Sequence, residues 1–139
     1  MPSSTDFKAL TREISGNVSQ LRTSQPEVMQ SFNAMGKAAL APGAIDAKTK
    51  ELIALGIGVA ARCDGCIGFH TQALARLGAT RAEVHETLAI AVYMGGGPSL
   101  MYAANAVAAF DQVAPEQVPP PRRLSGPARA CARALSVLP

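Results

Sequence analysis

The chain has 139 residues, of which 48% are hydrophobic and 17% are charged. This length suits one domain with its own core, and the chain is too apolar to be disordered. The formal net charge of +3 comes entirely from residues 115–139, which hold four arginines and one glutamate, so we expect no nucleic-acid partner.

The first two predicted elements are amphipathic helices. A first helix over residues 5–22 is indicated by apolar side chains at helical spacing: Phe7, Leu10, Ile14, Val18 and Leu21. Ser24 and Glu27 have the spacing of a capping box, which predicts a second helix with Ser24 as its N-cap. That helix should end near Leu40, before the sequence Ala41-Pro42-Gly43. Alanine is abundant and β-branched runs are scarce, so the predicted fold class is all-α.

The third and fourth predicted helices flank a turn that contains two cysteines. Asp46 is a suitable N-cap for a helix from residue 47 to about 61, whose second half is uncharged. The fourth helix should begin with Asp64 as its N-cap and run to Leu77, before Gly78. Cys66 would then lie in its first turn.

Glycines separate the fifth and sixth predicted helices. Thr80 and Glu83 predict a capping box at the start of the fifth helix, which should end near Met94. The triplet at residues 95–97 interrupts the helical pattern, and the proline that follows suits the first turn of a sixth helix ending near Val113.

These last two helices carry few charges. No charged residue occurs from Thr87 to Phe110, but the glycines divide this stretch into halves that are too short to cross a bilayer. We therefore expect no membrane partner and two buried helices. Helices this apolar on most faces often pack against another subunit, so a homo-oligomer is expected.

The composition changes after the sixth helix. Six of the ten prolines lie from Pro115 onward. We expect a helical domain over residues 1–113 and a Pro/Arg-rich tail over 114–139, in which an extended linker is followed by a segment, 126–138, that could form a short amphipathic helix. The N-terminus has no apolar secretory segment, so we expect a cytoplasmic protein.

The sequence CDGCIGFH, residues 63–70, holds two of the three cysteines and one of the two histidines. The N–H groups and dipole of a helix start stabilise a thiolate at Cys66. His70 follows four residues later on the same face, where it can act as base or proton donor. Cys63 is close enough in sequence to form a disulfide with Cys66. The spacing indicates an attacking thiol at Cys66, a resolving thiol at Cys63 and a proton carrier at His70.

Other interpretations of these residues remain open. A zinc site would need four ligands, and His85 could join the two cysteines and His70, although the histidines are fifteen residues apart. The cysteines could also be buried and inert. His85 lies beside Glu86 in a charged first turn, which favours a surface position. Cys131 has no neighbouring partner in the sequence and is interpreted as structural or incidental.

The spacing of these residues resembles a known family. Glu51, eleven residues, Cys63-x-x-Cys66, three residues and His70 are similar to the AhpD-like alkylhydroperoxidase branch of the carboxymuconolactone decarboxylase family. The sequence EVHETLAIAVYMGGGPSLMYAANA is also similar to that family's core. The resemblance covers roughly residues 25–112.

The resemblance implies an all-helical fold of about six helices, with the CxxC motif at a helix start. It implies that Cys66 reduces a hydroperoxide and becomes a sulfenic acid, which Cys63 resolves as a disulfide. His70 and Glu51 would form the proton relay. No metal or organic cofactor is implied. The partners would be a hydroperoxide substrate, an external dithiol or disulfide reductant protein, and further copies of the chain in a trimer or hexamer.

Two points qualify what the resemblance implies. The AhpD branch carries a histidine immediately before the second cysteine, whereas this chain has Gly65, so one member of that relay is missing. In a simple helical hairpin, Glu51 would lie about 18 Å and His70 about 10 Å from the turn, so a steep crossing or a bridging water would be needed to join them.

Two other functions are kept as alternatives. One is an enzyme that acts on a lactone or carboxylate substrate, as in the decarboxylase branch of the family. The other is a non-enzymatic, zinc-stabilised oligomeric module.

Overall fold

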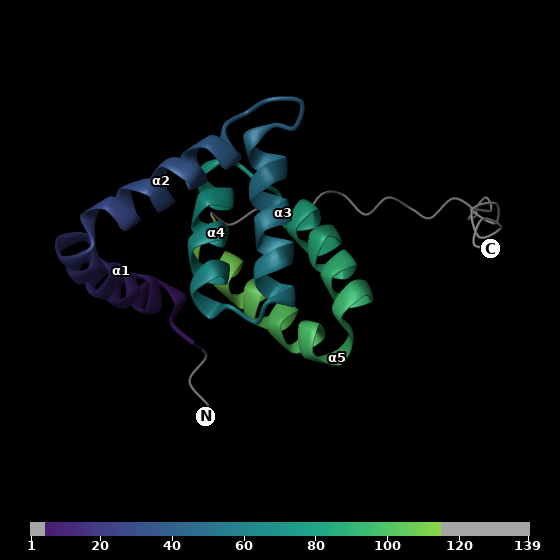
Figure 1. The fold of residues 1–139 in the computed structure, drawn as a ribbon. Coiled ribbons are helices and arrows are strands. Elements are labelled where there is room, and N and C mark those ends of the chain that lie inside the picture. The colour runs from purple at the N-terminus through teal and green to yellow at the C-terminus, as the bar shows by residue number, and fades with distance from the viewer. Residues whose placement is uncertain (1–4, 115–139) are drawn as a thin grey trace, which may run out of the picture.

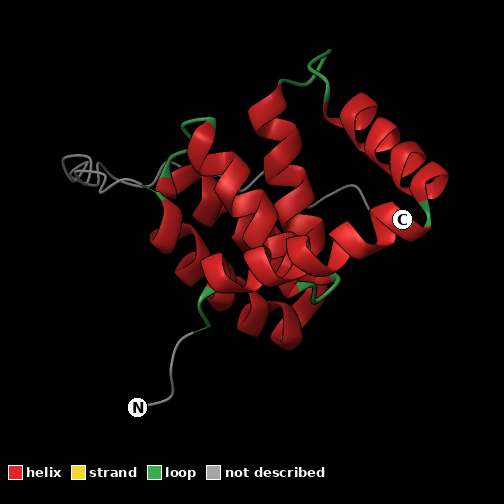
Figure 2. Ribbon diagram, turned by 90° about the vertical axis from the view of Figure 1, so that its left-hand side faces the viewer, coloured by secondary structure: helices red, strands yellow, loops and turns green. Residues whose placement is uncertain are grey.

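The computed structural model describes residues 5–114, which contain helices and no strands. The elements are α1 (Phe7–Ser24), α2 (Pro26–Leu40), α3 (Ala47–Ala60), α4 (Asp64–Arg76) and α5 (Arg81–Val113). Figure 2 shows them joined by short loops. The predicted all-α class is confirmed. The predicted tail helix and Cys131 lie outside the described residues.

Local signals place most of the helix boundaries. The side chain of Asp46 accepts a hydrogen bond from the N–H of Thr49 and caps α3, as predicted. Thr80 and Glu83 form the predicted capping box at the start of α5. Gly78 has a φ of 72°, a conformation that favours glycine, and it follows the last turn of α4.

The predicted capping box at Ser24 is wrong. Ser24 is the last residue of α1, where its hydroxyl donates to the carbonyl of Leu21. Gln25 occupies the N-cap of α2 without a side-chain capping bond, and Pro26 is the first helical residue. The proline starts α2 because its fixed φ suits a first turn and it has no N–H to satisfy.

The expected break between the fifth and sixth helices lies inside the element α5. Gly96 has φ 70° and ψ −155°, so the helix bends there into two arms. A side chain at Gly95 would collide with the buried Ser99, because an added Cβ would lie 1.9 Å from the Ser99 hydroxyl oxygen. Figure 1 shows the two arms running in different directions.

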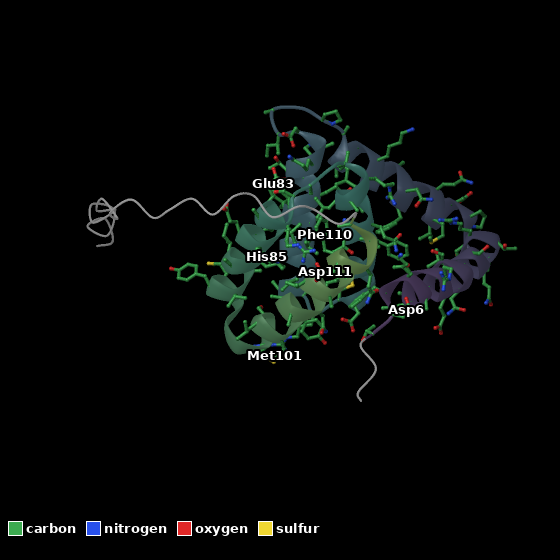
Figure 3. All side chains as sticks on the ribbon, turned by 180° about the vertical axis from the view of Figure 1, so that it is seen from behind. Asp6, Glu83, His85, Met101, Phe110 and Asp111 are labelled. Atoms are coloured by element: carbon green, nitrogen blue, oxygen red, sulfur yellow. A yellow bond between two sulfur atoms is a disulfide. The ribbon has the colours of Figure 1, made fainter. Side chains whose placement is uncertain are left out.

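Helix α3 occupies the centre of the bundle and packs against both α4 and α5 (Figure 1). The second half of α3, from Leu52 onward, carries no charged residue, which suits this position. The core combines large side chains from α1, α3, α4 and α5: Phe7, Leu55, Val59, Ile67, Leu74, Val84 and Phe110. The start of α1 is tied to the end of α5, where the N–H of Phe7 donates to Gln112. Figure 3 shows Asp6, Phe110 and Asp111 at these two ends.

Helix α2 lies at the edge of the bundle and has no buried residue. Three of its apolar side chains, which share one face by their spacing, are each 62% exposed: Val28, Phe32 and Met35. This face has no partner within the described chain.

No helix in the described part of the chain is both long enough and apolar enough to span a membrane.

We expect a pH-dependent contribution to stability from Glu83. It pairs with Lys48 across 2.7 Å and accepts the N–H of Thr80, and these two contacts hold the pKa of Glu83 below its ordinary value of 4.5. When folding lowers the pKa of a carboxyl group, that group stabilises the folded protein at pH values above its unfolded-state pKa. This stabilisation is lost as the pH falls through the folded-state pKa.

Glu83→Gln should therefore lower the free energy of unfolding by about 0.5–1 kcal/mol at neutral pH, and the difference from wild type should shrink as the pH falls through the folded-state pKa of Glu83. Urea unfolding at neutral pH and at a series of acidic pH values measures this. Glu86→Gln, in the same exposed turn, is the control. A deficit of Glu83→Gln that stays unchanged throughout the acidic series would contradict the assignment.

Candidate active site

The two cysteines of the CxxC motif lie at the start of α4 and form a disulfide, with their Cα atoms 5.2 Å apart. Arg62 turns the chain out of α3 with a φ of 57°. The N-cap of α4 is Cys63, which corrects the prediction of Asp64; Asp64 is the first helical residue. The sulfur of Cys63 accepts a hydrogen bond from the N–H of Cys66 at 3.1 Å and so takes the place of a capping oxygen.

Close approach of α3 to α4 holds this turn. The N–H of Cys63 donates to the carbonyl of Gly58 at 3.0 Å. A Cβ added to Gly58 would lie 3.0 Å from the Cβ of Cys66. The absence of a side chain at Gly58 therefore lets α3 lie directly against the second cysteine.

Glu51 and His70 meet without a bridging water. The Nδ1 atom of His70 lies 2.6 Å from a carboxylate oxygen of Glu51. Of the two expected ways to join them, the bridging water is not needed, because the contact is direct. Measured from the contact between Gly58 and Cys66, Glu51 lies seven residues earlier in α3, about 10.5 Å along that helix. His70 lies four residues later in α4, about 6 Å along its helix. Two long side chains cover the remaining difference.

Glu51 and His70 differ in their exposure to solvent. The Glu51 residue is buried, at 8% exposed, whereas the side chain of His70 is 26% exposed and reaches water. When Nδ1–H donates to the carboxylate, the neutral imidazole presents the lone pair of Nε2 to its other side. His70 follows Cys66 by four residues in α4, a spacing that puts both side chains on the same face of the helix.

Helix α1 also packs against the turn between the two cysteines. A Cβ at Gly65, between the cysteines, would lie 3.0 Å from the terminal methyl of Ile14. The space of a side chain at this position is thus taken by an apolar group from α1. The sequence showed that a histidine is missing there, but it could not show which group fills the space.

The two histidines are separated in the structure. His85 is exposed in the first turns of α5, as predicted, and lines a small apolar cleft with side chains such as Leu88 and Val107. Figure 3 shows His85 on the first arm of α5 near Glu83. Among residues 5–114, no group of three or more His, Cys, Asp or Glu side chains is placed to hold a metal ion. The alternative zinc site, with His85 as a ligand beside His70 and the two cysteines, is therefore not supported.

Residues 26–109 match the model of the carboxymuconolactone decarboxylase family. The chain is 44% identical over 107 residues to an uncharacterized protein of Cupriavidus necator, covering 77% of this chain and 95% of that protein. It is 34% identical over 82 residues to an uncharacterized protein of the cox locus of Paracoccus denitrificans, covering 59% of this chain and 74% of that protein.

Two solved structures of this family share the fold. A carboxymuconolactone decarboxylase family protein from Legionella pneumophila is 51% identical, with a TM-score of 0.77 over 78% of this chain and 97% of that one. A family protein from Thermotoga maritima, described in connection with an antioxidative response, is 28% identical. Its TM-score is 0.67 over 73% of this chain and 87% of that one.

A pair of glycine substitutions in α3 tests the close approach at the cysteines. Gly58→Ala should force Cys66 or α3 to shift and should destabilise the protein by about 1–3 kcal/mol. Gly56→Ala is the matched control, because its Cβ would meet only a methyl of Thr87, at an ordinary 3.6 Å. This control should be neutral or up to about 1 kcal/mol more stable.

Urea unfolding of both variants with the disulfide intact measures the difference. Equal stability of Gly58→Ala and Gly56→Ala would show that the two helices do not need the glycine at residue 58.

Proposed function

The chain belongs to the carboxymuconolactone decarboxylase family, and we propose that it is a thiol-dependent hydroperoxide reductase or disulfide oxidoreductase that cycles the Cys63–Cys66 pair. The observation that carries the proposal is the direct contact of His70 with the buried Glu51, one helical turn from the disulfide. A redox pair and a paired imidazole on the same helix supply the thiol and the proton carrier that this chemistry needs.

The first step is the attack of the Cys66 thiolate on the outer oxygen of a hydroperoxide. The O–O bond breaks, a sulfenic acid forms on Cys66, and the alkoxide leaves as an alcohol after taking a proton. His70 removes the thiol proton from Cys66 beforehand and returns it to the leaving oxygen. Glu51 holds the imidazole in the required tautomer and stabilises it when protonated.

The second step forms the Cys63–Cys66 disulfide. The Cys63 thiolate attacks the sulfur of the Cys66 sulfenic acid and the S–O bond breaks as the disulfide forms. The leaving hydroxide takes up the proton that the Cys63 thiol had lost and departs as water. The helix N–H that reaches the sulfur of Cys63 favours an anion at that atom, so each cysteine has a neighbouring group that supports its thiolate. An external dithiol then reduces the disulfide by exchange and is itself oxidised.

We also infer that the protein acts as a homo-oligomer, a trimer or a hexamer, in the cytoplasm. Proteins of this family are generally oligomeric. A groove of about 410 Å³ between α3 and α5 is lined mainly by apolar residues, and three of its side chains are between 47% and 66% exposed: Ile53, Ile57 and Ile90. A second copy would remove these side chains from water. A reducing compartment suits an enzyme that must return to the dithiol state.

A count of thiols tests the roles of the cysteines. After reduction, one equivalent of hydroperoxide should remove two alkylatable thiols from the wild type, as measured by intact mass. Cys63→Ser should accumulate a trappable sulfenic acid at Cys66, because the resolving thiol is absent. Cys66→Ser should lose peroxide reduction under dithiol supply.

Full peroxide reduction by Cys66→Ser would show that the attack is assigned to the wrong cysteine or that the mechanism is wrong. Turnover of a lactone or carboxylate substrate that survives loss of both cysteines would favour the decarboxylase-like alternative.

Substitutions in the relay should slow oxidation without preventing it. His70→Gln should reduce the rate of Cys66 oxidation by about 10²-fold or more, which is the usual contribution of a positioned general base. Glu51→Gln should reduce it less and alter the pH profile of the rate, because the carboxylate acts through the imidazole. His85→Gln is the matched control. Stopped-flow oxidation at several pH values measures all three, and an unchanged pH profile in both relay variants would remove them from the mechanism.

A further inference from the structure

A second cleft, of about 480 Å³, lies between α1, α4 and the end of α5, apart from the redox pair. It is lined by residues from all three helices: Lys8, Thr11, Arg12, Gln72, Ala75, Arg76 and Val113. We propose that this cleft binds a small anion that carries a phosphoryl group.

The charges around the cleft are of one sign. Lys8, Arg12 and Arg76 line it, and no carboxylate does. Within residues 5–114, none of these three side chains forms an ion pair. Lys8 and Arg12 are four residues apart on α1, where like charges repel each other. An anion placed among the three cations would relieve that repulsion.

The polar wall of the cleft is already ordered. The amide nitrogen of Gln72 donates to the hydroxyl of Thr11 at 2.7 Å, and this hydroxyl donates to the carbonyl of Phe7 at 2.9 Å. Thr11 is buried at 4% exposed. The bonds fix the carboxamide between α1 and α4, so its second N–H is available to a ligand with little loss of side-chain freedom.

The donor set favours a phosphoryl group over a single carboxylate. Guanidinium groups bind phosphate oxygens through two parallel N–H bonds, and lysine adds a compact charge. Three cations can balance a phosphate dianion, which a monocarboxylate does not match. The cleft volume is within the usual range of small-ligand sites, and Ala75 and Val113 supply an apolar wall for the body of the ligand.

The site is separate from the proposed redox chemistry. Gln72 follows Cys66 by six residues, about 9 Å along the axis of α4. Binding there can therefore be measured whether or not the protein reduces peroxides.

Residues 115–139 follow directly after the helix that supplies Val113. This segment holds four arginines and one glutamate, Glu116, so its net charge is unsuited to a cationic cleft. Glu116 is the one acidic side chain in this segment and could compete with an external anion, so its substitution is a necessary control.

Calorimetric titration of the full-length disulfide form with inorganic phosphate, at low ionic strength, tests the proposal. We expect saturable binding at one site. Arg12→Gln and Arg76→Gln should each weaken the affinity at least tenfold, whereas Arg22→Gln, also on α1 but outside the cleft, should leave it unchanged. The rise in Tm on adding phosphate should be as large for Arg22→Gln as for the wild type, and smaller for Arg12→Gln and Arg76→Gln. A measurable Tm in each variant also confirms that it is folded.

Four results would overturn the proposal. These are the absence of saturable binding to the wild type, equal affinities in the cleft variants and the Arg22→Gln control, and binding of benzoate as tight as that of phosphate. The fourth is a more than threefold gain of phosphate affinity in Glu116→Gln, which would assign the cleft to Glu116.

Discussion

The close approach of α3 to α4 at Gly58 is the constraint on which the rest of the site depends. It lets the backbone of α3 accept the N–H of Cys63 and places Cys66 against α3 without an intervening side chain. The same approach sets the separation of the two helices further along, where Glu51 and His70 meet at 2.6 Å. One missing Cβ thus positions both the sulfur pair and the carboxylate–imidazole pair.

Helix α1 imposes a second constraint on α4. A Cβ at Gly68 would lie 2.6 Å from a methyl of Thr11, and the space beside Gly65 is filled by Ile14. Two glycines on α4 therefore allow α1 to pack closely along it. The same contact places Ile14 against the redox turn and creates, at the far end of α4, the cleft that gathers Lys8, Arg12 and Arg76. The packing of one helix pair thus shapes two regions with different chemistry.

Much of this fold could be predicted from the sequence where a short-range signal decides the structure. Asp46, Thr80 with Glu83, and the glycines before Pro98 act within one helical turn, and each prediction is confirmed. The predicted cap at Ser24 was wrong because Pro26, two residues later, provides a competing start for α2. Cys63 was missed as a cap because a sulfur rarely fills that position. The distance between Glu51 and His70 depends on how two helices cross, which no local pattern encodes, so only the family resemblance pointed to Glu51.

The lack of burial in α2 has a consequence for how the molecule loses structure. A helix of 15 residues without a buried side chain has only marginal stability of its own in water. Its amide hydrogens should therefore exchange with solvent sooner than those of α3, whose opening requires the central core to separate. In a single chain, proteases acting within residues 5–114 would therefore cleave α2 before the central helices. Packing of another molecule against Val28, Phe32 and Met35 would remove that weakness, so the survival of α2 under digestion reports whether this face is covered.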